Sequence, residues 1–248
     1  VGVLFGAAAG LAVAAVFALF VVVLNTDQII TGTAVTLGGL GFTAVVYQSR
    51  FGATGTALTL PTLDAWTVPV LSEIPWVGSA LFAQAPTAYF TYALAPLLWW
   101  LLFRTEWGLE IRAAGEDPEA AAAAGVRVRT LRFATTVAAG ALAGIAGAHL
   151  ALAHTGTVSE GMSAGKGFIA IAVVVLGRWN PIGVLVAALF FGAASALQFA
   201  LQTLGLDIGY QLFLALPYVL TLAALAGWVG RSRAPAALAL PWPRDGHA

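Results

Sequence analysis

The sequence has no cysteine and very few charged side chains. None of its 248 residues is cysteine, and only 9% are Asp, Glu, Lys or Arg. The missing cysteines exclude a thiol-ligated metal site and a disulfide scaffold, although they do not fix the cellular compartment. Because there are only three histidines and no cluster of His, Asp and Glu, a metal centre is not expected either.

Two features that couple proteins to an energy source are also missing. The phosphate-binding pattern GxxxxGK[ST] does not occur, so the chain is not expected to bind ATP in the usual backbone cradle. The long apolar runs contain almost no ionisable side chain at mid-depth, whereas ion-coupled carriers usually place one there, where it is costly and functional. Both absences favour an energy source outside this chain.

What the sequence does contain is mostly apolar. Hydrophobic residues make up 60%, the formal net charge is zero, and the mean hydropathy is +0.91. Runs of about 20 apolar residues are long enough to cross the hydrocarbon core of a membrane as helices. These features predict an all-α, polytopic transmembrane bundle in a single domain over residues 1–248. The expected membrane segments are residues 2–24, 29–48, 87–103, 133–153, a broken pair at 162–177 and 182–202, and 212–229. For 162–177, a full crossing and a shorter, partly re-entrant element are both open.

The remaining segments divide between the two sides of the membrane. Residues 49–86 mix Gly, Thr, Pro and Trp and predict an extended loop, which we place outside. Residues 104–132 and the tail 230–248 are placed inside. With this orientation nine of the eleven Lys and Arg residues lie on the inner side, as the positive-inside rule requires.

Small residues recur at helical spacing in two of the expected membrane segments. Gly2, Gly6 and Gly10 are four residues apart, and Gly140 and Gly144 have the same spacing, with Gly147 as a third small position. Such spacing places small residues on one helix face, where a neighbouring helix can approach closely. We expect both segments to form packing seams.

Residues 105–132 are unusually polar for this chain. These 28 residues contain four of the eleven basic and five of the eleven acidic residues. Asp117 is a good N-cap, Pro118 suits the first helical position, and Gly125 supplies a stop after five alanines. The pattern predicts one short helix, which would be marginal alone in water and must be held by neighbours or a partner. A solvated loop between membrane helices is the alternative interpretation.

Several polar or interrupted positions are candidates for a translocation path. The hydroxyls and amides near the start of the second segment either line a path or cap the helix and bond back to its backbone. Asn180 and Pro181 interrupt an apolar run, with Asn180 as the expected cap, and such broken helices expose backbone at lined cavities. The candidate path residues are Gln28, Thr31, Thr33, Phe168, Asn180, Gln198 and Gln202.

Three stretches together resemble a known family. They are GLEIRAAGEDPEAAAAAGV with the following RTLRFATTVAAGALAGIAGAHLAL, then GMSAGKGFIAIAVVVLGRWNPIGVLVAALFFGAASALQ, and YQLFLALPYVLTLAALAG with PAALALPW after it. They are similar to ABC importer permeases of the branched-chain amino acid, ribose and nucleoside group, most of all the nucleoside or simple-sugar subfamily. Permeases of this group usually carry one or two helices before the position of Val1, so we expect the chain to be N-terminally truncated.

The resemblance implies a transport subunit rather than an enzyme, in a prokaryotic inner or plasma membrane. The short cytoplasmic helix would couple transport to ATP hydrolysis through Gly115, Glu116, Asp117, Pro118, Ala121, Ala122 and Gly125. Asp117 stands where the family pattern usually has Asn. The implied partners are an ABC ATP-binding subunit carrying ATP and Mg, a second permease subunit that is homologous or identical, an extracytoplasmic substrate-binding protein and the lipid bilayer, with no nucleic acid and no cofactor or metal in this chain.

The substrate is not determined by these residues, since nucleosides and simple sugars both present hydroxyls to Thr and Gln. A permease for branched-chain amino acids is an alternative within the same class. An ion-coupled secondary carrier and a membrane-embedded enzyme are alternatives from other classes. The carrier predicts an essential charge within the membrane, and the enzyme predicts a titratable cluster near one interface.

Overall fold

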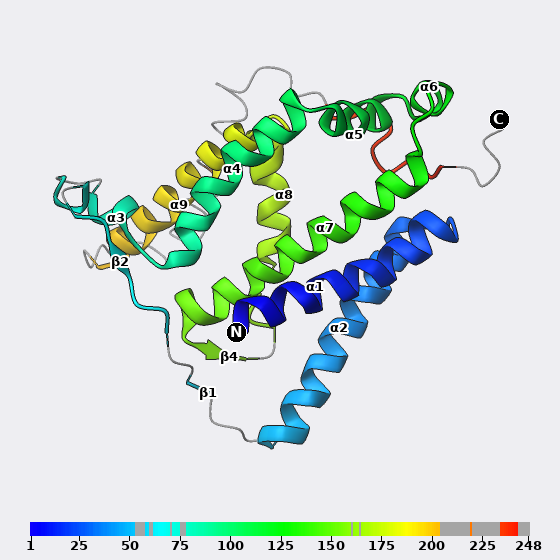
Figure 1. Ribbon diagram of the computed structural model, residues 1–248. Helices are drawn as coiled ribbons and strands as arrows, with labels where there is room; N and C mark the ends of the chain where they lie inside the picture. Colours follow the sequence, from blue (N-terminus) through cyan, green and yellow to red (C-terminus); the bar gives the residue numbers. More distant parts are fainter. Residues whose placement is uncertain are drawn as a thin grey trace. The chain divides into compact units, whose positions relative to one another are not determined.

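The computed structural model consists mainly of helices (Figure 1). It describes residues 1–52, 58–59, 62–69, 71–74, 78–159, 161–163, 165–203, 219 and 234–242. The predicted fold class, an all-α membrane bundle, is confirmed. Contacts within the chain divide it into two compact units, which are described separately: residues 1–91, 110–164 and 237–248 form the first, and residues 92–109 and 165–236 form the second.

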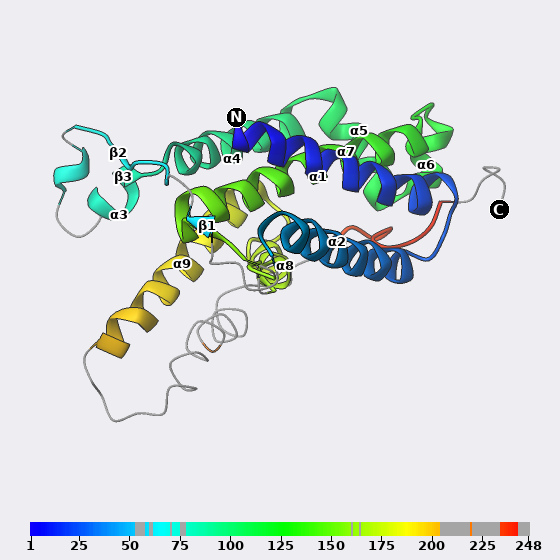
Figure 2. The same cartoon turned by 90° about the horizontal axis from the view of Figure 1, so that it is seen from below.

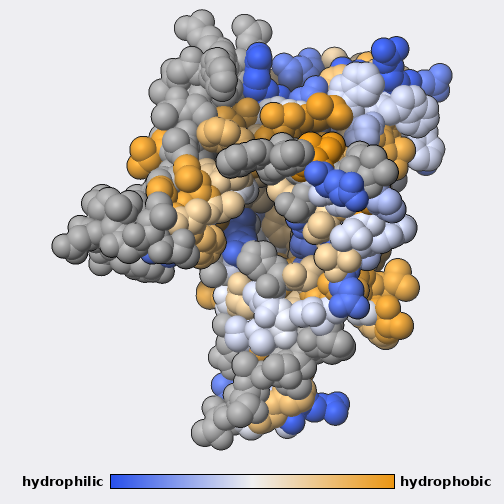
Figure 3. Space-filling view, turned by 90° about the vertical axis from the view of Figure 1, so that its left-hand side faces the viewer, coloured by the Kyte–Doolittle hydropathy of each residue, from blue (hydrophilic) through white to orange (hydrophobic). Residues whose placement is uncertain are grey.

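Four helices of the described ranges are long and apolar enough to cross a membrane. They are α1 (Gly2–Ala18) with its π-helical extension Leu19–Val23, α2 (Gln28–Phe51), α7 (Val128–His149) with the π-helical extension Leu150–Thr155, and α9 (Pro181–Thr203). Large apolar side chains are exposed on them, including Phe5 at 72% and Ile29 at 80%, and several apolar areas lie between hydrophilic ones on the face drawn in Figure 3. Lipid tails are as apolar as these side chains, so the exposure suits membrane helices.

Some expected segments differ from the helices observed. Helix α7 begins at Val128 rather than at 133. The segment expected over 162–177 is the shorter helix α8 (Lys166–Leu176), whose 11 residues extend only about 16 Å and fall short of a full crossing. The segment over 87–103 forms α4 (Pro86–Arg104), which is not among the four helices named above. The segment 212–229 lies outside the described residues, apart from 219.

Helices α1 and α7 pack side by side through their glycines (Figures 1 and 2). A Cβ atom placed on Gly10 would lie 2.2 Å from the Gly140 carbonyl oxygen, and one on Gly144 would lie 2.0 Å from the Gly6 carbonyl oxygen. Because the paired numbers run in opposite directions, the helices are antiparallel. The two predicted seams are therefore confirmed, and each is the other's partner. Gly147 is not part of the seam, since a Cβ there would meet nothing within 4 Å.

The region between α2 and α4 contains short elements rather than a plain extended loop. Strand β1 (Leu58–Thr59) pairs antiparallel with β4 (Thr157–Val158), and β2 (Trp66–Thr67) pairs antiparallel with β3 (Ala83–Gln84). A 3-10 turn (Leu71–Glu73) and the short helix α3 (Gly78–Phe82) lie between β2 and β3. The β1–β4 pair ties the region to the segment that follows α7, whereas the β2–β3 pair lies within the region.

In the second unit, α8 and α9 are joined by a tight turn. Arg178 and Trp179 both have positive φ, 57° and 58°, an uncommon conformation for residues other than glycine. The Asn180 side-chain oxygen accepts a hydrogen bond from the Ile182 N–H at 3.0 Å, and Pro181 opens α9. The predicted break and cap are confirmed. A Cβ on Gly177 would lie 2.4 Å from the Val184 nitrogen, so glycine is needed where the two helices meet.

Candidate coupling site

Helix α5 (Glu106–Glu116) opens the polar stretch and was not predicted from the sequence. The Thr105 hydroxyl donates to the Leu101 carbonyl at 2.6 Å and accepts from the Gly108 N–H at 3.2 Å. Threonine as a cap, with the acidic Glu106 in the first turn, is the signal that identifies this helix start. Gly108 is buried, and a Cβ there would lie 2.1 Å from the Leu101 carbonyl oxygen. The turn from α4 into α5 therefore requires glycine.

Helix α6 (Pro118–Ala123) is the short helix that the sequence predicts. The Asp117 carboxylate accepts from the Glu119 N–H at 3.1 Å and from the Ala120 N–H at 3.0 Å. Asp117 thus caps the helix, and its negative charge lies at the positive end of the helix dipole. The predicted N-cap is confirmed.

The other end of α6 is closed by a Schellman motif. The Gly125 N–H donates to the Ala122 carbonyl at 2.9 Å, and the Val126 N–H donates to the Ala121 carbonyl at 3.0 Å. Gly125 has a φ of 91°, which suits glycine because a side chain there would be strained. Both ends of this six-residue helix therefore have their backbone groups satisfied, which compensates in part for its small length.

A small apolar core lies under α6. Ala114, Ala121 and Val128 come from α5, α6 and α7 and are 3%, 4% and 3% exposed. Partly buried residues packed against them are Ala113, Val126, Leu131 and Trp242. Of the five alanines at 120–124, Ala121 is buried and anchors α6 on this core. The other four, Ala120, Ala122, Ala123 and Ala124, are exposed and form what we call the alanine face.

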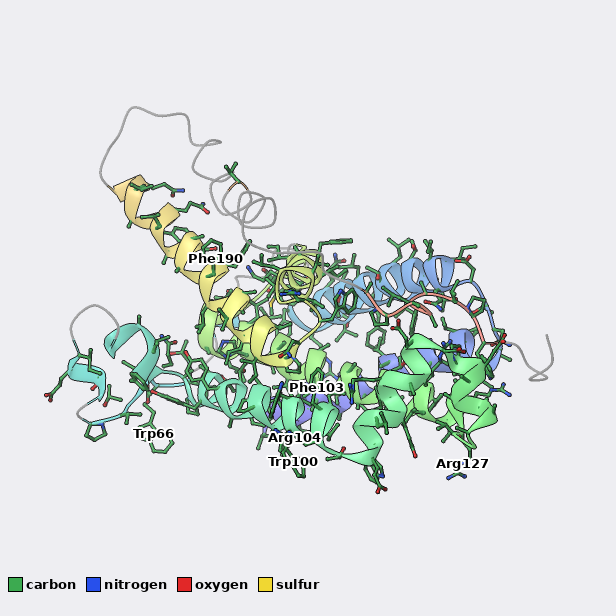
Figure 4. All side chains as sticks on the ribbon, turned by 90° about the horizontal axis from the view of Figure 1, so that it is seen from above. Trp66, Trp100, Phe103, Arg104, Arg127 and Phe190 are labelled. Carbon is green, nitrogen blue, oxygen red and sulfur yellow. The ribbon has the colours of Figure 1, made fainter. Side chains whose placement is uncertain are left out.

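Two arginines at the start of α7 bond to backbone carbonyls of distant segments. Arg129 donates to the Val23 carbonyl at the end of α1. Arg132 donates to the Leu240 carbonyl at 2.8 Å and reaches the Ala114 carbonyl at 3.5 Å. The positive charges of Arg127, Arg129 and Arg132 predicted that this segment lies on the inner side of the membrane. Nothing in the sequence indicated that two of these arginines bond to distant carbonyls. Arg127 itself is exposed, at the outer edge of the segment (Figure 4).

The structure places the seven predicted coupling residues on one continuous segment, with different exposure. Ala121 is buried, Gly115 and Pro118 are half-buried, and the exposed members are Glu116, Asp117, Ala122 and Gly125. The Gly115 carbonyl accepts from the Ala237 N–H at 3.0 Å. The coupling role of these residues stays a prediction, while their local structure is the capped helix described above.

Two of the predicted path residues in the first unit, Thr31 and Thr33, have local hydrogen bonds, and Asp27 just before them caps the helix. Asp27 accepts from the Ile29 and Ile30 N–H groups at 2.8 and 2.9 Å and caps α2. Thr33 donates back to the Ile29 carbonyl at 2.8 Å, and the Thr31 hydroxyl lies 2.9 Å from that of Thr26. Gln28 is the first residue of α2. These bonds match the capping alternative, and a role in the path stays a prediction.

The other path candidates belong to the second unit. Phe168 is 80% exposed near the start of α8, and Asn180 caps α9. Gln198 is 7% exposed, and the side-chain nitrogen of Gln202 is buried without a hydrogen-bond partner in the described part of the chain. Within that part, no group of three or more His, Asp or Glu gathers as a metal site. The path candidates of the first unit and those of the second unit are therefore described separately.

Helices that can span a bilayer, together with a short capped helix that presents small exposed side chains, define a helical membrane protein. The chain belongs to the family described as branched-chain amino acid transport system / permease component, which matches residues 1–225. It is therefore a multi-pass permease subunit of an ABC transporter in the cell membrane, a transport component rather than an enzyme.

Three relatives are similar over most of the chain. TsgC13 of Haloferax volcanii, provisionally named a glucose ABC transporter permease, is 39% identical over 207 residues, which are 82% of this chain and 61% of the relative. NupQ of Bacillus subtilis, a guanosine ABC transporter permease, is 34% identical over 238 residues, 95% of this chain and 75% of the relative. NupC of Lactococcus lactis, a nucleoside ABC transporter permease, is 35% identical over 242 residues with the same coverage. The chain spans 61% to 75% of these relatives' lengths, and no solved structure matches it.

Proposed function

We propose that the chain forms the membrane pathway of an ATP-driven importer for nucleosides or simple sugars. The observation that carries the proposal is the alanine face of α6, which is exposed while Ala121 anchors the helix on the core beneath. Small side chains let another backbone approach closely, so a partner helix or loop can lie directly on α6. ATP and Mg²⁺ are bound by that partner, an ABC ATP-binding subunit, and not by this chain.

Further partners complete the proposed importer. An extracytoplasmic binding protein delivers the substrate, and a second permease subunit, homologous or identical, supplies the other half of the pathway. The substrate class rests on the relatives, whose names refer to guanosine, nucleosides and glucose. Branched-chain amino acids are the second candidate class, because the family is described by that substrate. An ion-coupled carrier is the competing mechanism.

The experiment uses the full-length protein, purified with its ATP-binding, permease and binding-protein partners and reconstituted in liposomes with ATP and Mg²⁺ inside. Uptake of labelled nucleosides, simple sugars and branched-chain amino acids is measured separately. We expect nucleoside or sugar uptake that stops when ATP or Mg²⁺ is removed. Uptake that persists without ATP and follows an ion gradient would establish the carrier instead.

The docking role of α6 is tested in the same vesicles with Ala122→Arg. Its exposed position accommodates a long side chain without disturbing the core, but the charge obstructs close approach of a partner. We expect the ATP-binding subunit to dissociate and uptake to be lost. Ala122→Ser is the matched control, because it stays small and should retain both properties. Normal assembly and uptake in Ala122→Arg would refute docking at the alanine face.

A further inference from the structure

Residues 237–242, which we call the C-terminal strap, contact the coupling segment from a distant part of the sequence. The strap is the red segment beside α5 and the start of α7 in Figure 1. Its residues belong to the first unit, as do α6, α7 and residues 110–116 of α5. The proposed transport cycle does not use these residues, and the sequence pattern did not assign them a role.

Three separate contacts hold the strap. At its start, the Ala237 N–H donates to the Gly115 carbonyl at 3.0 Å, next to the end of α5. In its middle, the Leu240 carbonyl accepts from the Arg132 guanidinium at 2.8 Å. At its end, Trp242 packs against the core formed by Ala114, Ala121 and Val128. The strap thus contacts the elements on both sides of α6 and the core on which α6 rests.

The contacts differ in kind, and together they constrain α6 against α7. Arg132 lies on α7 and bonds to the strap, while its second nitrogen reaches the Ala114 carbonyl of α5 at 3.5 Å. The Trp242 side chain packs against the core that contains Ala121, the buried residue of α6. A six-residue helix cannot transmit a displacement to a membrane helix unless it moves with that helix as one body, because short helices are marginal on their own.

We propose that the C-terminal strap is a positioning element that locks α6 to α7, with Arg132 and Trp242 as its two fastening residues. A push on the alanine face then moves α7 instead of being absorbed by local rearrangement of the loop. This inference rests on the proposed function, since it concerns how the displacement of α6 is transmitted. It concerns transmission and not docking, so the two can fail independently.

The test measures the ratio of substrate transported to ATP hydrolysed in the reconstituted complex. For Arg132→Ala and Trp242→Ala we expect the ATP-binding subunit to stay bound and to hydrolyse ATP, while this ratio falls about fivefold or more, the lower end of typical coupling energies. Leu238→Ala is the matched control within the strap, because its side chain is 53% exposed and its loss leaves all three contacts intact. An unchanged ratio in both fastening variants overturns the proposal.

A cross-link distinguishes positioning from general damage. The sequence contains no cysteine, so Gly115→Cys and Ala237→Cys give a defined pair, joined by a short thiol-specific bifunctional reagent that reductant can cleave. Because Gly115 is itself a predicted coupling residue, the reference is the same Cys pair with Arg132 intact. We expect the cross-link to restore the ratio in Arg132→Ala to that of this reference, and its cleavage to abolish the rescue. A cross-linked Arg132→Ala protein that stays uncoupled overturns the proposal, because the strap would then be held without effect.

Two further measurements keep the outcomes separate. If Trp242→Ala fails to assemble, the ratio is measured in Arg132→Lys instead, since lysine keeps the charge but lacks the fork that reaches two carbonyls. An unchanged ratio in Arg132→Lys overturns the proposal. If the wild-type complex shows no ATP-dependent uptake, the proposed function fails. In that case the cross-linking yield of the Cys pair, compared with Gly115→Cys and Ser49→Cys, still tests the position of the strap.

Discussion

Replacing Gly144 with alanine should destabilise the protein, although alanine is the better helix former. The new Cβ would lie 2.0 Å from the Gly6 carbonyl oxygen, whereas ordinary van der Waals contact begins at 3.4 Å. Because the obstructing atom is backbone, α1 and α7 must separate by roughly 1.4 Å at this point, and close contacts along the seam weaken with them. Overpacking of this kind costs about 1–3 kcal/mol.

Gly147→Ala is the matched control on the same helix, since its Cβ would meet nothing within 4 Å. Both substitutions gain the same helix propensity, about 0.5–1 kcal/mol in water, so their difference isolates the seam. We would measure loss of helical circular dichroism of the purified full-length protein during titration of mild-detergent micelles with a denaturing detergent. Gly144→Ala should unfold earlier than Gly147→Ala, and Gly10→Ala combined with Gly144→Ala should be less than additive. Coincident unfolding of the two single variants would refute the packing seam.

Three further predictions concern local structure. Asp117→Ala should weaken α6 by about 1 kcal/mol and lower coupled uptake, whereas Asp117→Asn should keep both near wild type; equal behaviour of the two would contradict the cap. Gly108→Ala should misplace α5, because the new Cβ would lie 2.1 Å from the Leu101 carbonyl oxygen. A cysteine introduced by Gly115→Cys should then react faster with a thiol label; an unchanged labelling rate would contradict the requirement for glycine at position 108. Asn180→Ala should lower the denaturation midpoint by loss of the α9 cap, while Asn180→Asp should not; a midpoint unmoved by alanine would speak against the cap.

Much of the local structure of the coupling segment could be predicted from the sequence. Asp117, Pro118 and Gly125 mark a helix through interactions with backbone groups two to four residues away, and such interactions depend only on neighbours in the chain. The same holds for Asn180 and Pro181 at the start of α9. The membrane helices were predicted because the length and polarity of a run determine whether it can cross a bilayer.

Contacts between distant segments could be predicted from the sequence only in part. The glycine spacing predicted that two helices each have a close-packing face, but not that α1 and α7 pair with each other, nor that Gly147 lies off the seam. Helix α5 was missed because its apolar residues are few and its cap, Thr105, follows directly on a membrane segment. The pairing of the seams depends on which surfaces meet in space, whereas the start of α5 has a local signal in Thr105 and Glu106.

The sequence by itself determined the class of this protein, the four helices long enough to span a membrane and the caps of α6, because each rests on composition or on bonds between near neighbours. Only the tertiary structure decided that Ala121 is the buried anchor of α6 and that Arg132 and Trp242 hold the C-terminal strap to it. The physical reason is that a backbone carbonyl or a small apolar core has no side-chain signature in the distant segment that binds it. More than 100 residues separate Arg132 from Leu240, and only folding brings the guanidinium to that carbonyl.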